Sequence, residues 1–167
     1  MPRGPFHGVP LLLKDFFCHT AGDPYYEGTH FLKDLGWREN HDTFLTAKFR
    51  AAGFVFVGKT NLPELAIGVA ADDTGVFGRT NNPWNLDCSP GGSSSGSCAA
   101  VAAGLVSVAH ANDGTGSIRI PASARGLVGL KPSRGRVSAG PARVPYLLGN
   151  VSEHVVTRTV RDSAGVL

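Results

Sequence analysis

The chain alternates short apolar runs of strand character with segments of helical periodicity, and this alternation constrains its fold more than any other feature. Three runs rich in β-branched and aromatic residues predict strands, and they occupy residues 8–17, 54–60 and 105–111. A helix is predicted after each run: from an Asp42 N-cap to Gly53, from Ser95 to Ala103, and, shorter, within SIRIPASARGLVG. This repeated strand–helix order predicts an α/β fold class, with a mixed or parallel β-sheet core flanked by helices.

Composition and charge place the chain among globular proteins and exclude several classes of partner. Hydrophobic residues make up 42% and charged residues 17% of the 167 residues, which favours a packed domain over a disordered chain. The net charge of +3, with no basic run, is too small to predict nucleic-acid binding. No apolar stretch reaches the length of a membrane span. We therefore expect neither nucleic acid nor a membrane as a partner.

The cysteines and histidines predict neither a disulfide framework nor a metal site. The three cysteines form no CxxC pair and are odd in number, which predicts a reducing, cytoplasmic location. The six histidines make neither HxxxH nor HExxH, so no metal is expected. His110 lies close to Asp113 and Ser117 in the sequence. A Ser–His–Asp triad normally draws its members from separated segments, which disfavours this one.

Two segments rich in glycine and serine each open a predicted helix, GGSSSGS at 91–97 and DGTGS at 113–117. A helix start presents unpaired backbone N–H groups and a partial positive charge, which stabilise a bound anion or a developing oxyanion. The plain alternative for either segment is an N-cap or a flexible linker. A phosphate-binding loop is disfavoured, because neither segment contains the GxxxxGK[ST] pattern or its lysine.

Lys14 ends the first apolar run, and two interpretations of it are open. A lysine at the end of a strand is commonly solvated. If Lys14 is instead buried behind the three leucines that precede it, desolvation lowers its pKa and leaves a neutral amine that acts as a base. Lowering a lysine pKa from about 10.4 to about 7.5 corresponds to about 4 kcal/mol, which requires a dry, hydrogen-bonded site.

Six motifs follow one another along the chain and together carry a family resemblance. They are GVPLLLKD, VGKTN, NPW, SPGGSSSGS, DGTGSIRIPAS and GLVGLKPSRGRV. The series resembles the amidase signature family, and most of all its bacterial amidases, over nearly the whole chain. The resemblance implies hydrolysis of a small-molecule carboxamide, linear or cyclic, without a cofactor.

The resemblance also implies a Ser-cisSer-Lys triad whose members can be placed residue by residue. Ser117 is the implied nucleophile, Ser93 the bridging serine on a cis peptide bond, and Lys14 the base. A hydroxyl both donates and accepts, so Ser93 can pass a proton from Ser117 to a neutral lysine. Attack on the amide then gives an acyl-enzyme through a tetrahedral oxyanion. The implied oxyanion hole consists of the backbone N–H groups of Gly114, Thr115, Gly116 and Ser117, and the implied supporting residues are Ser94, Asp113 and Arg119.

Three residues depart from the family pattern. Thr115 replaces a glycine of the oxyanion turn, and a positive φ there would strain a β-branched residue. Twisting one oxyanion donor out of line costs about 10²–10³ in rate. Ser95 replaces a common glycine in the first turn, which is a milder change. Arg125 stands where small residues or cysteine are usual, and an unpaired buried arginine would destabilise the fold.

Length is the remaining departure. Family enzymes are several hundred residues long, so the resemblance implies that residues 1–167 are a partial amidase signature domain truncated at both ends. Apolar faces are then left open, and we expect a homo-oligomer or a completing chain segment to cover them. Two alternatives to an active amidase stay open: a catalytically impaired remnant, and the amidase subunit of a tRNA-dependent amidotransferase.

Overall fold

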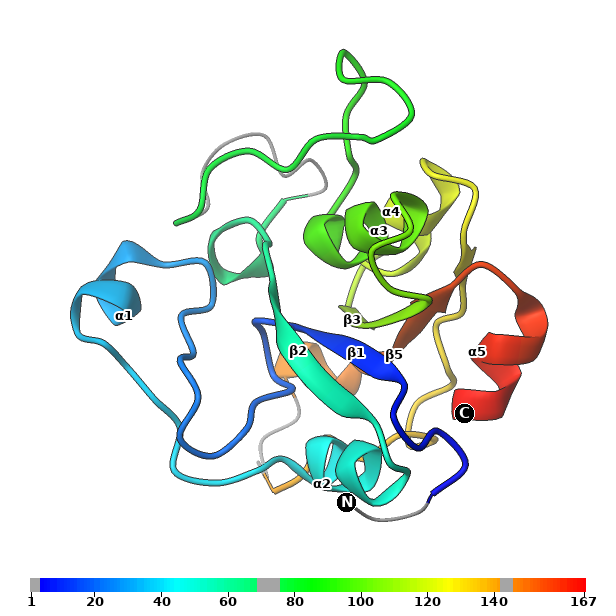
Figure 1. The fold of residues 1–167 in the computed structure, drawn as a ribbon. Helices are drawn as coiled ribbons and strands as arrows, with labels where there is room; N and C mark the ends of the chain where they lie inside the picture. Colours follow the sequence, from blue (N-terminus) through cyan, green and yellow to red (C-terminus); the bar gives the residue numbers. More distant parts are fainter. Residues whose placement is uncertain (1–3, 69–75, 142–145) are drawn as a thin grey trace.

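A mixed β-sheet of five strands forms the centre of the computed structural model, which describes residues 4–68, 76–141 and 146–167 (Figure 1). The strands are β1 (Pro10–Lys14), β2 (Val55–Thr60), β3 (Val108–Asp113), β4 (Val128–Gly129) and β5 (Ser152–Thr157). Their order across the sheet is β2-β1-β3-β5-β4. Strand β1 runs parallel to β2 and β3, whereas β5 runs antiparallel to β3 and β4. The predicted α/β fold class with a mixed sheet is confirmed.

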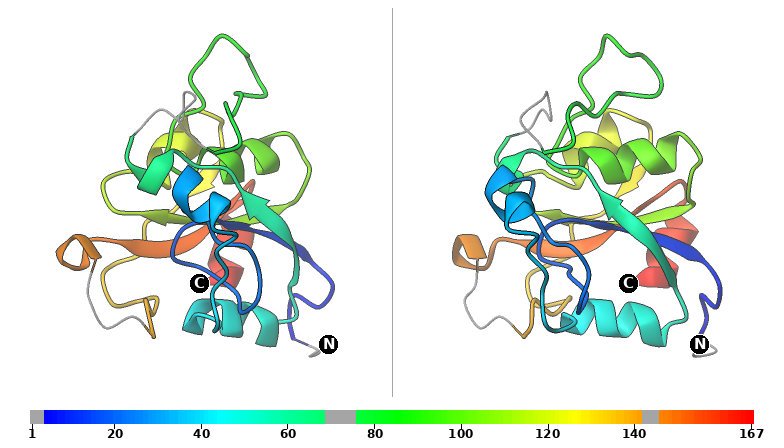
Figure 2. Two further views of the ribbon diagram at one scale, coloured as in Figure 1. Left: turned by 90° about the vertical axis from the view of Figure 1, so that its left-hand side faces the viewer. Right: turned by 60° about the vertical axis from the view of Figure 1, so that its left-hand side comes forward.

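Helices cover both faces of this sheet. The α-helices are α1 (His30–Asp34), α2 (Phe44–Ala51), α3 (Ser95–Ala102), α4 (Arg119–Ser123) and α5 (Val160–Val166), and two 3₁₀ segments are η1 (Glu64–Ala66) and η2 (Tyr146–Gly149). Helices α3 and α4 lie over one face, and α2 and α5 lie over the other (Figures 1 and 2). Among the described residues, no helix combines the length and the apolar character that a membrane crossing requires.

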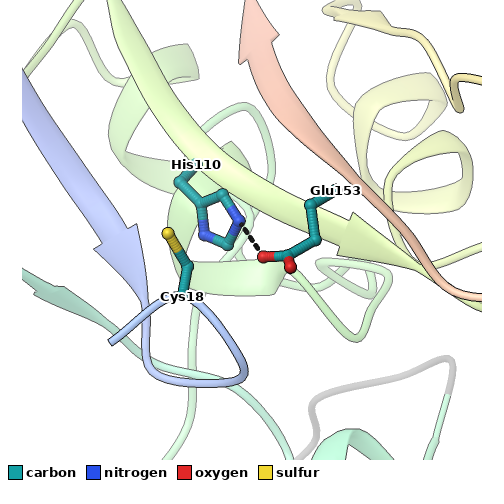
Figure 3. Close-up of side chains that lie close together, drawn as sticks. All are labelled: Cys18, His110 and Glu153. Atoms are coloured by element: carbon teal, nitrogen blue, oxygen red, sulfur yellow. Dashed lines mark hydrogen bonds and ion pairs between the residues drawn. The ribbon is translucent and has the colours of Figure 1, made fainter. Parts of the chain in front are cut away.

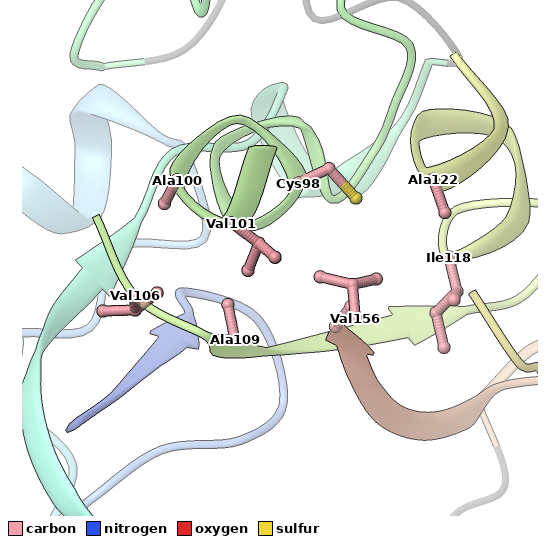
Figure 4. Close-up of a cluster of buried hydrophobic side chains, with 9 residues drawn as sticks. Cys98, Ala100, Val101, Val106, Ala109, Ile118, Ala122 and Val156 are labelled. Atoms are coloured by element: carbon pink, nitrogen blue, oxygen red, sulfur yellow. The ribbon is translucent and has the colours of Figure 1, made fainter. Parts of the chain in front are cut away.

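Alternation along the central strands divides the apolar residues between two cores. Ala109 and Val156 belong to the core beneath α3 and α4 (Figure 4). Their neighbours Val108 and Val155 belong to the core that packs against α2. Successive side chains on a strand point to opposite faces, so each strand contributes to both layers. The parallel strands β1 and β3 are therefore covered on both sides, which is the usual setting of parallel strands.

The three strands predicted from the sequence are confirmed as β1, β2 and β3; β1 and β2 are shorter than predicted, and β3 begins three residues later and ends two residues later. The predicted helices correspond to α2, α3 and α4. Strands β4 and β5 have no counterpart among the predicted elements. Every residue of β5 is buried, so its sequence SEHVVT lacks the polar–apolar alternation by which a half-exposed strand is recognised.

Thr43, and not the predicted Asp42, is the N-cap of α2. The Thr43 side chain accepts a hydrogen bond from the Thr46 backbone N–H at 3.2 Å. Asp42 instead accepts from the backbone N–H of Ala21 at 2.8 Å and from Arg50 Nε at 2.9 Å. Both residue types are good caps. The Asp42 prediction is wrong because the carboxylate is engaged by the loop after β1 and by α2 itself.

The start of α3 packs directly on the backbone that follows β2. The Gly96 N–H donates to the Asn61 carbonyl at 3.0 Å. A Cβ atom at Gly96 would lie 2.5 Å from the Asn61 nitrogen, so only glycine allows this approach. The contact fixes the beginning of α3, and with it the residues just before the helix.

Arg125 places a charge inside the packed region next to α4. The residue is only 2% exposed, and within the described residues none of its guanidinium nitrogens has a hydrogen-bond partner. Burial lowers the pKa of this guanidinium. Burial also raises the pKa of the Cys98 thiol to about 12, and the Arg125 charge opposes that rise. Arg125 is therefore a buried cation without a carboxylate partner among the described ion pairs, and Cys98 is the group that favours its charged form.

Replacing Arg125 by methionine should raise the free energy of unfolding by about 1–4 kcal/mol, because a neutral side chain of similar length removes an uncompensated buried charge. Urea denaturation followed by circular dichroism measures the change. Arg125→Lys keeps the charge and is the control, with no gain expected. A methionine variant no more stable than the wild type would mean that the guanidinium is satisfied in solution.

Candidate active site

The three residues singled out for catalysis come from separate segments that meet at one end of the sheet. Lys14 is the last residue of β1, Ser93 lies just before α3, and Ser117 lies between β3 and α4. Because β1 and β3 are parallel neighbours, the segments that follow them emerge at the same edge. The Ser94 backbone N–H donates to the Ser117 carbonyl at 3.2 Å. This bond joins the two glycine- and serine-rich turns side by side.

Lys14 is fully buried, so the interpretation of a solvated strand end is wrong. Its Nζ donates to Ser93 Oγ at 2.8 Å and to Asn112 Oδ1 at 2.6 Å. Both partners are themselves buried. The Gly92–Ser93 peptide bond is cis, as the family resemblance implies. The hydrogen bonds thus link the end of β1 to the turn before α3 and to β3.

Burial lowers the pKa of Lys14 from its ordinary value of 10.5 to about 7. Cys98, Asp113 and Glu153 act in the opposite direction and raise it. Desolvation disfavours the ammonium form more than these groups favour it. A substantial fraction of Lys14 is therefore a neutral amine near neutral pH, which is the form that accepts a proton.

The serines that follow Ser93 tie α3 to the sheet. Ser94 occupies the N-cap position of α3, yet its side chain makes no cap bond and donates to the Asn112 carbonyl at 3.3 Å. Ser97 Oγ donates to the His110 carbonyl at 2.7 Å. Ser94 therefore holds the N-cap position without a side-chain bond to the helix. Strand β3 presents the backbone carbonyls that accept hydrogen bonds from the hydroxyls of these serines.

Asp113 organises the second turn. Its carboxylate accepts from the backbone N–H groups of Gly116 at 2.7 Å and Ile118 at 3.1 Å, and from Arg119 Nε at 2.9 Å. Burial by itself raises the pKa of this carboxyl, and the hydrogen bonds outweigh it, so that the pKa falls to about 2. Asp113 is thus a permanent anion that braces the turn together with Arg119.

Thr115 does not have the strained conformation that its β-branched side chain would resist. It is exposed, and it is absent from the described non-glycine residues with positive φ. The neighbouring Gly116 has the positive φ, 138°. The expected distortion at Thr115 is therefore wrong. The residue that needs glycine in this turn is the next one.

Two polar residues that contact this site were not singled out from the sequence. Asn112 holds Lys14, as described above. Lys131 Nζ donates to the Gly114 carbonyl at 2.6 Å and lies 3.5 Å from Asp113 Oδ1. A signal for Asn112 was available, since it is a polar residue at the end of a buried strand directly before Asp113.

Comparison with known proteins shows the family of this chain. The sequence model of the Amidase family matches residues 1–167. The chain belongs to the amidase signature family. It is 49% identical over 169 aligned residues to the 6-aminohexanoate-cyclic-dimer hydrolase of Paenarthrobacter ureafaciens, covering 100% of this chain and 34% of that protein. It is 46% identical to the putative amidase AmiC of Mycobacterium tuberculosis (strain ATCC 25618 / H37Rv), covering 95% of this chain and 33% of that protein.

Solved structures give the same assignment. A structure of 6-aminohexanoate cyclic dimer hydrolase complexed with substrate superposes with a TM-score of 0.93 at 48% identity, covering 98% of this chain and 34% of that one. A glutamyl-tRNA(Gln) amidotransferase subunit from Thermotoga maritima superposes with a TM-score of 0.86 at 38% identity, covering 99% and 36%. This amidase-family chain therefore spans about a third of the length of the relatives it matches.

A second buried polar cluster of this amidase-family chain consists of Cys18, His110 and Glu153 (Figure 3). His110 Nε2 lies 2.9 Å from Glu153 Oε2, and since a carboxylate only accepts, Nε2 carries the proton. Asp113 is engaged by Arg119. A Ser–His–Asp triad of Ser117, His110 and Asp113 is therefore wrong.

One ligand atom from each member of this cluster lies within 4.8 Å of the others, and sulfur, nitrogen and oxygen donors suit Zn²⁺. Burial, however, raises the pKa of the Cys18 thiol, which disfavours the thiolate that binds a metal. The His110 nitrogen that faces Glu153 is already hydrogen-bonded. The other ring nitrogen of His110, Nδ1, is buried without a hydrogen-bond partner among the described residues, and Glu153 raises the pKa of Lys14.

Lys14 should make the stability of the chain rise with pH. Its pKa of about 7 in the folded chain lies below its ordinary value of 10.5. Between these values the unfolded chain binds more protons, so the free energy of unfolding increases with pH, by on the order of 5 kcal/mol in all. Lys14→Met removes this contribution.

Urea denaturation of the wild type and of Lys14→Met, from about pH 7 to about pH 10, measures the effect, because the other groups titrate in both proteins. The stability difference between the two proteins should change steadily across this window. Parallel pH dependences would contradict a lowered pKa at Lys14.

Proposed function

We propose that this chain carries the catalytic centre of an amidase that hydrolyses the C–N bond of a linear or cyclic carboxamide. The observation that supports this most directly is Lys14, a fully buried amine whose Nζ lies 2.8 Å from Ser93 Oγ. Its pKa of about 7 suits a general base near neutral pH. The proposed roles are nucleophile for Ser117, proton relay for Ser93 and base for Lys14.

The first step forms the acyl-enzyme. Ser117 Oγ bonds to the amide carbon as its proton passes to Ser93 Oγ, and the proton of Ser93 passes to the lone pair on Lys14 Nζ. The carbonyl oxygen then carries a negative charge. Collapse of this tetrahedral intermediate breaks the C–N bond, and the leaving nitrogen takes a proton back from Lys14 through Ser93. No cofactor enters the scheme.

Backbone N–H groups of the second turn are proposed to hold the oxyanion. Gly114, Thr115 and Ser117 supply the proposed donors. The Gly116 N–H is already donated to Asp113 at 2.7 Å, so Gly116 is left out of the donor set. The bonds from Asp113 to the turn keep the other donors in place before the charge develops, which is where catalytic stabilisation of this kind originates.

Deacylation uses the same relay, with water in place of Ser117. A water molecule attacks the acyl carbon as its proton passes through Ser93 to Lys14, and Ser117 leaves with a proton returned along the same route. The product is a carboxylic acid. The nucleophile and the base never touch in this scheme, which is the reason for a hydroxyl between them.

We propose further that residues 1–167 form part of a larger amidase domain, since the matched relatives are about three times as long. Residues that select the acyl group would then lie outside this chain or in a completing segment. Its exposed apolar side chains, among them Phe31, Ile67 and Leu105, are surfaces that such a segment would cover.

One observation favours a second candidate function. The chain is 47% identical over 134 residues to a glutamyl-tRNA(Gln) amidotransferase subunit of Mycolicibacterium vanbaalenii, although this covers only 80% of it. The same serine and lysine would serve in that role. Hydrolysis of simple amides without any partner protein would count against it.

A fluorophosphonate should label the wild-type chain once, on Ser117, because the relay activates that hydroxyl. Intact mass spectrometry measures the adduct. Ser117→Ala should abolish labelling, and Lys14→Ala should slow it by about 10²-fold or more, as loss of a general base does. The control is Ser123→Ala, which removes an exposed serine on α4 and should label like the wild type.

Two outcomes would contradict the proposal. Labelling that persists in Ser117→Ala would move the nucleophile elsewhere. A chain that is folded by circular dichroism yet stays unlabelled would support the catalytically impaired remnant.

A further inference from the structure

Lys14 has a second hydrogen-bond partner that the relay does not use. We infer that Asn112 is a positioning residue: its side-chain oxygen holds one N–H of Lys14, so that in the neutral amine the lone pair can take the place of the N–H that otherwise donates to Ser93. The inference rests on the proposed function, in which Lys14 takes a proton from Ser93. Asn112 itself exchanges no proton in this scheme.

The contacts fix the orientation of the Asn112 amide. Its Nδ2 donates to the Phe16 carbonyl at 2.8 Å, and only the NH₂ group of an amide can do so. Oδ1 is therefore the atom that faces Lys14, 2.6 Å from Nζ. Asn112 is 3% exposed, and its backbone carbonyl accepts from Ser94 Oγ at 3.3 Å. The side chain is held from both sides and has one orientation available.

Hydrogen-bond counting explains what this acceptor does. A neutral lysine amine has two N–H groups and one lone pair. When one N–H is directed at Asn112 Oδ1, the second N–H and the lone pair remain. Either of these two can then point at Ser93. Without Asn112, the amine keeps only its hydrogen bond to Ser93, rotation about the last side-chain bond is less restricted, and the lone pair spends less time on the Ser93 hydroxyl.

The neutrality of Asn112 is as important as its geometry. The groups that already raise the pKa of Lys14 face it from three elements: Cys98 from α3, Asp113 from β3 and Glu153 from β5. A carboxylate in place of the Asn112 amide would add a negative charge in direct contact with Nζ and stabilise the ammonium. An amide oxygen accepts the same hydrogen bond without that charge.

Asn112→Asp and Asn112→Leu test this inference. The second-order rate of fluorophosphonate labelling is measured from about pH 6 to about pH 10. Asn112→Asp should shift the midpoint of the rate profile upward by about one pH unit or more, so that labelling is slow near neutral pH and recovers at high pH. Asn112→Leu removes the acceptor, and its labelling should be slower at every pH, by about 10-fold or more, since a misplaced base loses this much.

A matched control is Asn82→Asp, because Asn82 is also a buried asparagine and its amide bonds to the Ser89 carbonyl, not to Lys14. Its profile should keep the wild-type midpoint. A merely structural role for Asn112 would lower the rate in both Asn112 variants without moving the midpoint in Asn112→Asp. That result would overturn the inference.

A second measurement does not depend on activity. In protein with isotope-labelled lysine, NMR titration of the Lys14 side chain should give a higher midpoint in Asn112→Asp than in the wild type. An unchanged midpoint in the folded variant would also overturn the inference. If Ser117→Ala and Lys14→Ala label like the wild type, the proposed function fails. If labelling is lost in those two variants but the pH profiles of the Asn112 variants match the wild type, only the role of Asn112 fails.

Discussion

The burial of one amine at the end of β1 is the constraint on which the rest of the site depends. A lysine in a dry interior is tolerable when it sheds its proton and its N–H groups find acceptors. Strand β1 lies between β2 and β3 and has apolar layers on both faces, so water is excluded from Lys14. Ser93 and Asn112 supply neutral oxygens. Sheet order, helix placement and the tight turn before α3 all serve to bring these atoms around Lys14.

The surroundings of two neighbouring titratable groups favour opposite charge states: Lys14 is driven toward its neutral form and Asp113 toward its charged form. Burial dominates at Lys14 and lowers its pKa to about 7. At Asp113, bonds from backbone N–H groups and from Arg119 outweigh burial and lower the pKa to about 2. Near neutral pH, one group can therefore exchange a proton and the other cannot. Such a separation of roles between adjacent groups is a recurrent pattern of acid–base sites.

The sequence predicted what depends on local pattern. Strands β1 to β3 follow from apolar runs, whereas the catalytic roles that the motifs imply for Lys14, Ser93 and Ser117 stay predictions. Features decided by distant partners were missed or wrong. The engagement of Asp42 by Ala21 and Arg50, for example, left Thr43 as the cap of α2. Strand β5 was not predicted because it is buried on both faces and lacks a polar–apolar alternation. Asn112 was not predicted as a site residue because its side-chain contact with Lys14 spans 98 positions of the sequence.

The long span of these contacts has a consequence for how the chain folds. The hydrogen bonds of Lys14 close loops of 79 and 98 residues, and closing loops of this length costs chain entropy before any contact is gained. Proteins dominated by such non-local pairings fold slowly compared with those built from local ones. The pairing of β1 with β3 is the event that brings both partners within reach. The hydrogen bond between Lys14 and Asn112 therefore forms only when β1 and β3 have come together.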